Sequence, residues 1–186
     1  MIKRLINIKK LPYNITVHNF FSGIYFNLIL KKIISLIIDN KLKKILDFGC
    51  GFGYLKKKII KKISHILVIN YDIIPELSEI KTYKNLRFDC LVANQVFYLF
   101  KENDLNNLIV YLKNKLPNLK LIVVISRQSF LNNIGKFILN EKEAHKGTKL
   151  KPSQEFKILT NHCVILKKIN IFFLSDIYLF SFNKNK

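Results

Sequence analysis

Residues 45–53, Ile-Leu-Asp-Phe-Gly-Cys-Gly-Phe-Gly, combine an acidic residue with three alternating glycines at the end of a short apolar run. The carboxylate is Asp47, and the glycines are Gly49, Gly51 and Gly53. Because glycine lacks a Cβ, the chain can turn tightly there and bring its backbone close to a ligand. The chain has only six glycines, so three in one turn argue against a chance cluster. The segment predicts a strand that ends in a ligand-binding turn.

The spacing of the glycines distinguishes this turn from a dinucleotide-binding turn. That motif has the form Gly-x-Gly-x-x-Gly and directs a helix N-terminus at a pyrophosphate. Here the third glycine comes one residue early, and Tyr54 stands where the motif requires glycine. The carboxylate of Asp47 would also repel a pyrophosphate. The turn therefore favours a ligand with a positive centre and an ammonium group.

The same turn resembles motif I of the class I S-adenosylmethionine-dependent methyltransferases, a strand ending in Asp-x-Gly-x-Gly-x-Gly. Asp72, 19 residues after Gly53, ends the next apolar run and matches the acidic residue that binds both ribose hydroxyls in that family. Residues 88–97 look like the family's fourth-strand motif, which passes the methionine end of the cofactor. The resemblance implies S-adenosylmethionine as cofactor and the following binding residues: Asp47, Gly49, Cys50, Gly51, Gly53, Asp72, Ile73 (against adenine), Asn94 and Gln95.

Apolar periodicity predicts alternating strands and helices, and hence an α/β fold with a mostly parallel, Rossmann-like open sheet and helices on both faces. In the last predicted helix, Ser153 is the expected N-cap and Glu155 lies in the first turn. We expect one structural domain, with residues 1–40 as an N-terminal helical cap on a methyltransferase domain of residues 41–186. The predicted helices are 19–38, 54–62, 104–115 and 153–161, and the predicted strands are 44–48, 65–71, 89–93, 119–126, 163–173 and 176–182.

The resemblance covers the chain from about residue 40 to the end, with one departure. The family closes its sheet with a strand pair that contains one antiparallel strand, for which residues 177–182 are the candidate. Only 16 residues separate Asp72 from Asp89, where the family places a helix and a third strand. We therefore expect the third strand to be shortened or absent. No acidic residue is left to read the adenine amino group unless Asp89 does so.

The residues just after the family's fourth strand constrain the acceptor. Enzymes that methylate amines of nucleic-acid bases carry Asn-Pro-Pro-Tyr or a close relative there, whereas this chain has Asn-Gln-Val-Phe. The resemblance thus favours methylation of oxygen or nitrogen on a small-molecule or lipid-like acceptor. His145 and His18 are the candidate bases, and Tyr98 and Arg127 are candidates for the acceptor pocket. An RNA methyltransferase and a non-catalytic methyltransferase-like scaffold remain as alternatives.

Composition adds limits on partners and location. The net charge of +20 is almost all lysine, dispersed along the chain, and predicts non-specific contact with nucleic acid or anionic membrane. The isolated cysteines Cys50, Cys90 and Cys163 fit neither a zinc site nor a disulfide framework, so we expect no metal and a reduced, cytoplasmic setting. Residues 11–30 carry too many polar groups to span a membrane. They predict a helix that caps the domain, or a peripheral amphipathic helix.

Overall fold

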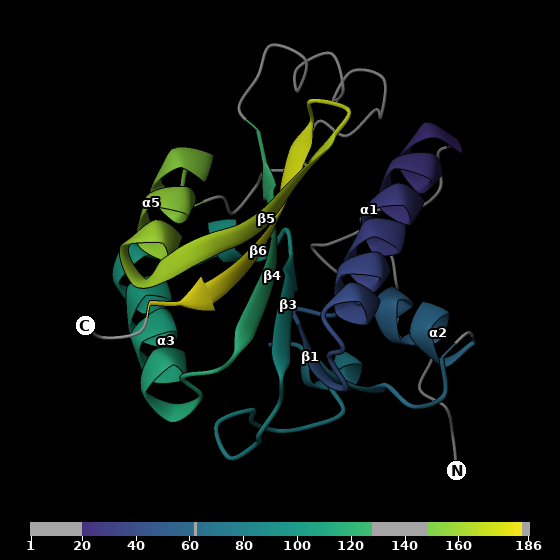
Figure 1. Cartoon of the computed structure of the whole chain (residues 1–186), viewed down its shortest axis with the longest axis horizontal. Coiled ribbons are helices and arrows are strands. Elements are labelled where there is room, and N and C mark those ends of the chain that lie inside the picture. Colours follow the sequence, from purple (N-terminus) through teal and green to yellow (C-terminus); the bar gives the residue numbers. More distant parts are fainter. Residues whose placement is uncertain (1–19, 62, 128–148, 184–186) are drawn as a thin grey trace.

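The computed structural model describes residues 20–61, 63–127 and 149–183 (Figure 1). The candidate bases His18 and His145 lie outside the described residues. The elements in chain order are α1 (Phe20–Asp39), β1 (Lys44–Phe48), α2 (Tyr54–Ile60), β2 (Leu67–Tyr71), the 3-10 helix η2 (Pro75–Leu77), β3 (Cys90–Asn94), the 3-10 helix η3 (Phe97–Leu99), α3 (Glu102–Lys115), β4 (Lys120–Ser126), α5 (Pro152–His162), β5 (Cys163–Ile171) and β6 (Ser175–Phe182).

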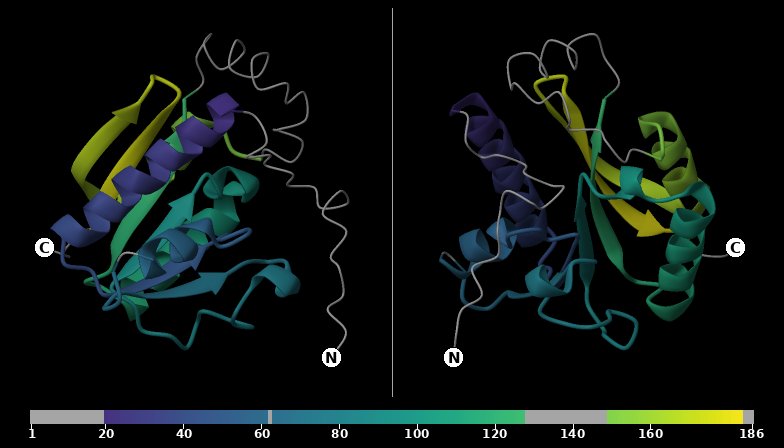
Figure 2. Two further views of the ribbon diagram at one scale, coloured as in Figure 1. Left: turned by 90° about the vertical axis from the view of Figure 1, so that its right-hand side faces the viewer. Right: turned by 180° about the vertical axis from the view of Figure 1, so that it is seen from behind.

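One six-stranded sheet with the order β2-β1-β3-β4-β6-β5 forms the centre of the molecule. Strands β1 to β4 pair in parallel, and β6 lies antiparallel between β4 and β5. Helices α1 and α2 cover one face, and α3 and α5 cover the other (Figures 1 and 2). The predicted fold class is confirmed, including the antiparallel strand inserted near the C-terminus.

Two apolar layers hold the helices on the sheet. On one face, Ile33 and Ile37 of α1 and Ile59 of α2 are fully buried against the strands. On the other face, Leu105 and Ile109 of α3 are fully buried in a separate cluster. Burying each such side chain contributes about 1.5–3 kcal/mol. Because both faces are covered, the interior parallel strands are apolar at nearly every position, as the sequence indicated.

The segment between Asp72 and Asp89 contains no strand, and all of its residues are described. Its only regular element is η2, a 3-10 helix of three residues. The expectation that the third strand is shortened or absent is confirmed. The sheet therefore ends at β2, and loop residues take the place of the missing strand.

The start of α5 differs from the prediction. Lys151 is the N-cap and Pro152 occupies the first helical turn, so Ser153 lies inside the helix. The backbone N–H of Lys151 donates to the Gln154 side-chain oxygen, at 2.9 Å, which satisfies the N-cap residue. Glu155 does lie in the first turn, but it is buried, and burial raises its pKa to about 8. Its charge at neutral pH is therefore largely suppressed, and it contributes little to the helix dipole.

Candidate cofactor site

The glycine turn after β1 wraps around the end of β2. The backbone N–H groups of Gly49 and Cys50 both donate to the Tyr71 carbonyl, at 2.8 and 3.1 Å. Gly49, Gly51 and Gly53 have φ angles of +71°, +52° and +67°, in the left-handed region that favours glycine. The backbone conformation alone therefore favours glycine at all three positions.

The space around each glycine shows which of the three permit close packing and which is open to a ligand. A Cβ on Gly49 would lie 2.6 Å from the Val96 side chain, and a Cβ on Gly53 would lie 2.6 Å from the Asn70 amide nitrogen. A Cβ on Gly51 would meet no atom within 4 Å. Gly49 and Gly53 thus permit close packing within the protein. Gly51 presents bare backbone to open space, as a ligand-contacting glycine should.

That open space belongs to a cavity of about 940 Å³ beside the glycine turn and the carboxyl ends of the parallel strands. Its position agrees with the general rule for ligand sites in open α/β sheets. All the predicted cofactor residues except Gly53 line it, and Tyr98 lines it as well. Asp47 and Asp72, predicted from separate segments, therefore share one cavity. Helix α1 supplies an apolar wall through Phe26 and Leu30.

Asp47 is a buried carboxylate with a raised pKa. Its side chain is buried beside the glycine turn. Burial is the main cause that raises the pKa of Asp47 to about 7, and the negative charges of Asp72 and Glu79 raise it further. A cationic ligand in the cavity would favour the ionised form of this carboxylate.

Asp72 fastens the glycine turn to the loop after β2. Its Oδ2 accepts the Gly51 backbone N–H and its Oδ1 accepts the Ile74 backbone N–H, both at 3.0 Å. An ionised carboxylate has about four acceptor sites, so each oxygen retains one for a ligand hydroxyl. Ile73, next in sequence, is 85% exposed on the cavity wall. An apolar side chain held in that position is suited to pack on a flat ring.

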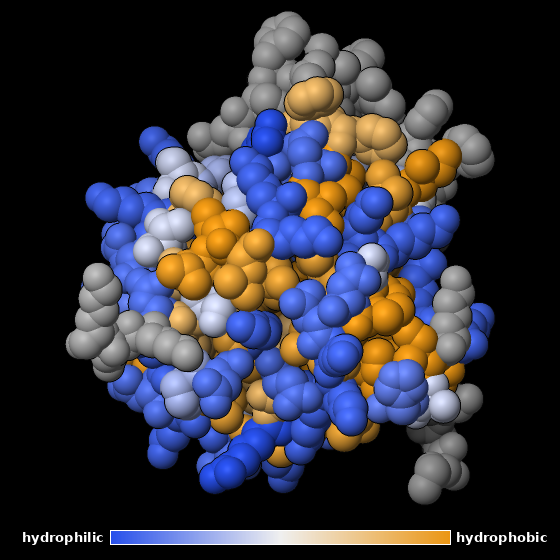
Figure 3. Space-filling view, in the orientation of Figure 1, coloured by the Kyte–Doolittle hydropathy of each residue, from blue (hydrophilic) through white to orange (hydrophobic). Residues whose placement is uncertain are grey.

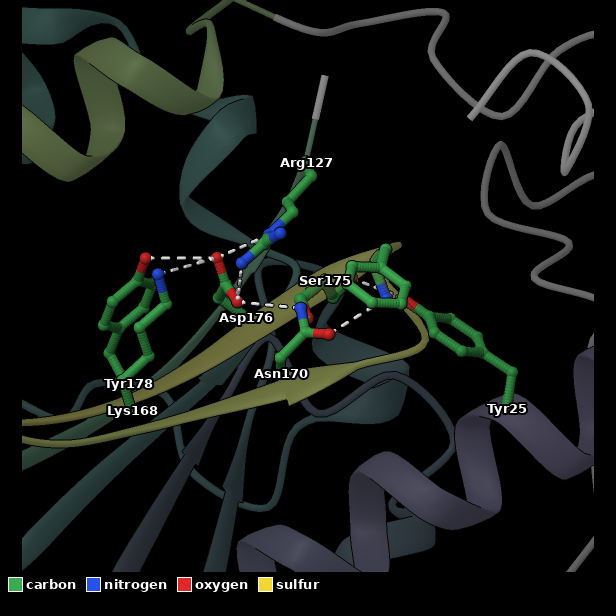
Figure 4. A network of polar contacts seen from close by, with 8 residues as sticks. Tyr25, Arg127, Lys168, Asn170, Ser175, Asp176 and Tyr178 are labelled. Atoms are coloured by element: carbon green, nitrogen blue, oxygen red, sulfur yellow. Dashed lines mark hydrogen bonds and ion pairs between the residues drawn. The ribbon is translucent and has the colours of Figure 1, made fainter. Parts of the chain in front are cut away.

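Asn94 and Gln95, at the end of β3, differ in the hydrogen bonds that their side chains make within the protein. The Oδ1 atom of Asn94 is buried without a hydrogen-bond partner, which leaves an acceptor for a ligand at the cavity. The Gln95 side-chain amide instead donates to the Tyr25 hydroxyl at 3.0 Å and to Ser175 Oγ at 3.4 Å. The Tyr25 and Ser175 hydroxyls also hydrogen-bond to each other (Figure 4). Gln95 thus ties α1 and β6 to the cavity edge, a linkage that the sequence did not reveal.

Arg127 lies outside the cavity lining, so the structure does not support the predicted role in the acceptor pocket. Its guanidinium forms a two-point ion pair with Asp176, at 2.7 and 2.8 Å (Figure 4). Asn170, Lys168 and Tyr178 contact the same carboxylate. The Asp176 side chain is largely buried, and these partners hold its pKa below its ordinary value against the opposing effect of burial. The ion pair explains why the cation just after β4 is unavailable to a substrate.

The structure does not support Asp89 as the acidic residue that would bind the adenine amino group. Its Oδ2 accepts the backbone N–H groups of Lys43 and Lys44, at 3.0 and 2.9 Å, where β1 begins. It therefore lies at the amino ends of the strands, the edge opposite the cavity. An aromatic group that the sequence reasoning missed lines the cavity instead: Phe48, Tyr71 and Tyr83, with ring centroids 5.0–5.4 Å apart. Phe48 is the last residue of β1 and Tyr71 is the last residue of β2. Their positions at the strand ends were the sequence signal that could have identified them as cavity residues.

Within the described residues, neither the cysteines nor a cluster of metal-ligating side chains adds chemistry to the site. Cys50 lines the cavity, but burial, followed by the charge of Asp47, raises the pKa of its thiol to about 12. It therefore packs as a neutral thiol, and all three cysteines are free. The described part of the chain contains no group of three or more His, Cys, Asp or Glu side chains that could hold a metal. It also contains no helix long and apolar enough to cross a membrane.

Comparison with known proteins defines the class of fold. No protein-family model and no curated protein sequence matches the chain. Magnesium protoporphyrin IX methyltransferase from Synechocystis PCC 6803, solved with bound SAH, superposes with a TM-score of 0.61 at 17% identity over 89% of this chain and 88% of that one. N-methyltransferase NodS from Bradyrhizobium japonicum WM9 gives 0.63 at 14% identity, over 86% and 97%. Small RNA methyltransferase HEN1 gives 0.63 at 14%, over 86% and 25%. The chain has the fold of the class I S-adenosylmethionine-dependent methyltransferases.

Proposed function

We propose that this protein is an S-adenosylmethionine-dependent methyltransferase that acts on the oxygen or nitrogen of a small-molecule or lipid-like acceptor. The observation that carries the proposal is the shared cavity: Asp47 and Asp72 line it, and Gly51 opens onto it. The solved structures with this fold include several methyltransferases, among them two with bound SAH. We also propose a cytoplasmic location, which the three free cysteines support.

The cavity residues suit the three parts of the cofactor. Asp72 would accept the ribose hydroxyls, Ile73 and the rings of Tyr71 and Tyr83 would border the adenine, and Asp47 would face the amino-acid end. When bound, the cofactor supplies a methyl group on a sulfonium and its own leaving group. The work left to the chain is to hold donor and acceptor in line, and to exclude water. His145 and His18 remain the proposed bases for the acceptor.

The character of the cavity supports a small or lipid-like acceptor. Its volume of about 940 Å³ lies near the upper end of the range for small-molecule sites, about 300–1,000 Å³. Beyond the predicted cofactor residues, its wall includes Phe26, Leu30, Tyr98 and Leu99. Such a wall would bury an apolar acceptor beside the methyl group.

Methyl transfer can be assigned to an acceptor class with radiolabelled cofactor. We expect the full chain, incubated with methyl-labelled S-adenosylmethionine and a cell extract, to label the small-molecule or organic-soluble fraction. The Asp72→Ala variant is the matched control and should label neither. Label confined to RNase-sensitive material would support the RNA alternative, which the +20 charge and the likeness to HEN1 favour. Absence of cofactor binding in a cooperatively folded sample would support the scaffold alternative.

Asp47 predicts a pH dependence of both cofactor affinity and stability. Because its pKa in the free protein is about 7, affinity for S-adenosylhomocysteine should fall as the pH drops below 7, by up to about tenfold per pH unit. The Asp47→Asn variant should bind more weakly at pH 8 and should lose this pH dependence. Titration calorimetry from pH 5.5 to 8.5 measures both.

Ionisation of Asp47 has the opposite effect on stability: it strengthens cofactor binding but destabilises the ligand-free protein. A carboxylate with a folded-state pKa raised above its unfolded value destabilises the folded state increasingly as the pH rises from the unfolded pKa towards about 7. Without ligand, Asp47→Asn should therefore unfold at a higher temperature than the parent at pH 8, with little difference at pH 4. Equal affinity of the two proteins at pH 8 would contradict the role assigned to Asp47.

A further inference from the structure

The turn of the β5–β6 hairpin is made by two phenylalanines in a conformation that disfavours them. Phe172 and Phe173 have φ angles of +48° and +59°. The backbone N–H of Leu174 donates to the Ile171 carbonyl at 2.9 Å, which closes a four-residue turn around them. Positive φ at both central residues is the signature of a type I′ turn, in which Asn-Gly is the favoured pair. Bulky side chains with positive φ are uncommon and strained.

The strain is not offset by packing of the two rings. Phe172 is 59% exposed and Phe173 is 65% exposed, so neither side chain is held in the core. One local contact supports the backbone: the Phe173 N–H donates to the Asn170 side-chain oxygen at 3.1 Å. A turn that disfavours phenylalanine and leaves it in water is explained if the rings are buried against something outside the chain.

The turn lies at the same end of the sheet as the cavity. Ser175, two residues after Phe173, pairs with Ser126 at the carboxyl end of β4 and hydrogen-bonds to Tyr25 of α1. Figures 1 and 2 show the hairpin turn at the end of the molecule where α1 begins. In the space-filling view, apolar side chains reach the surface over the hairpin among hydrophilic ones (Figure 3). The turn is therefore a convex apolar tip, not a groove.

The positive net charge of the chain favours an anionic partner for the turn. Lysine and arginine outnumber acidic residues by 32 to 12. The hairpin lysines Lys167 and Lys168 are ion-paired with Asp39 and Asp176, at 3.7 and 3.4 Å, so the attraction comes from the net charge of the chain. A positive surface is attracted to anionic lipid, and exposed aromatic rings insert at the boundary between headgroups and acyl chains. A convex tip can enter a fluid interface without a complementary pocket. We propose that the Phe172–Phe173 turn inserts into an anionic membrane surface and holds the protein there peripherally.

The sharpest test replaces the strained pair with the residues that the turn prefers. The double variant Phe172→Asn/Phe173→Gly should relieve strain and raise the unfolding temperature by about 2–8 °C. The same variant should bind at least tenfold more weakly to vesicles containing about a third phosphatidylserine. Co-sedimentation of the full chain with these vesicles, and with phosphatidylcholine vesicles, measures binding. Opposite shifts in stability and binding separate a lost contact from a damaged fold.

The control is Ile60→Asn, which removes a 59%-exposed apolar side chain from the end of α2. It should leave vesicle binding unchanged. The proposal is overturned if the wild type does not bind phosphatidylserine vesicles at physiological salt, or if the double variant binds them as tightly. It is also overturned if light scattering shows that the turn instead joins two copies of the chain. Because vesicle binding needs no methyl transfer, the result stands apart from the proposed activity.

Discussion

The Gly51→Phe variant should lose detectable binding of S-adenosylmethionine and S-adenosylhomocysteine while it still folds. A Cβ at this position meets no protein atom within 4 Å, so the ring does not have to displace the core. It would instead occupy the part of the cavity that the cofactor needs. We expect affinity to fall by at least about a hundredfold, or 2.7 kcal/mol. Titration calorimetry measures the loss, and circular dichroism checks the fold.

The matched control is Gly51→Ala. Both variants place an L-residue at a φ of +52°, so both carry the same backbone strain of about 1–2 kcal/mol. Only the phenylalanine reaches far into the cavity. The alanine variant should therefore retain measurable binding at a slightly lower unfolding temperature. If both variants bind as the parent does, the glycine turn does not touch the ligand.

The Asp72→Ala variant should bind the cofactor at least tenfold more weakly. A hydrogen bond to a charged group contributes about 1.5–3 kcal/mol, which corresponds to about 10- to 150-fold in affinity. The substitution also removes the two contacts that fasten Gly51 and Ile74, so the turn itself becomes less ordered. Both effects weaken binding.

Glu76→Ala is the control for Asp72→Ala. Glu76 lies four residues further on, in η2, and does not line the cavity. Its removal changes the net charge by the same amount and should leave affinity unchanged. The Asp72→Asn variant keeps one of the two turn contacts, because its amide oxygen can still accept the Gly51 N–H while its NH2 group cannot accept the Ile74 N–H. Unchanged affinity in Asp72→Ala would remove the ribose assignment.

The fold was predictable because its signals are local and repeated. Apolar runs such as residues 119–126 have the length and composition of buried parallel strands, and the helix of residues 104–115 repeats its apolar positions at helical spacing. The cavity was predictable because a glycine turn and an acidic strand end must meet at the carboxyl edge of a parallel sheet. The short spacing between Asp72 and Asp89 predicted the loss of the third strand.

The features that the sequence could not show depend on contacts between distant residues. Arg127 is committed to Asp176 across a strand pair, and Gln95 to Tyr25 across the sheet and α1. Nothing in their own neighbourhoods indicates those partners. Asp89 was misjudged for a different reason. It comes just before β3 and not after it, so its carboxylate lies at the edge of the sheet opposite the cavity. Phe172 and Phe173 are not residues that favour a turn with positive φ, so the sequence contained no signal for it.

A crystal structure grown with saturating S-adenosylhomocysteine tests the central claim most directly. We expect the ligand in the cavity, with its ribose hydroxyls on Asp72, its adenine beside Ile73 and its amino-acid end towards Asp47. A well-folded protein whose cavity stays empty under those conditions, or holds the nucleoside away from both carboxylates, would contradict the proposed cofactor site.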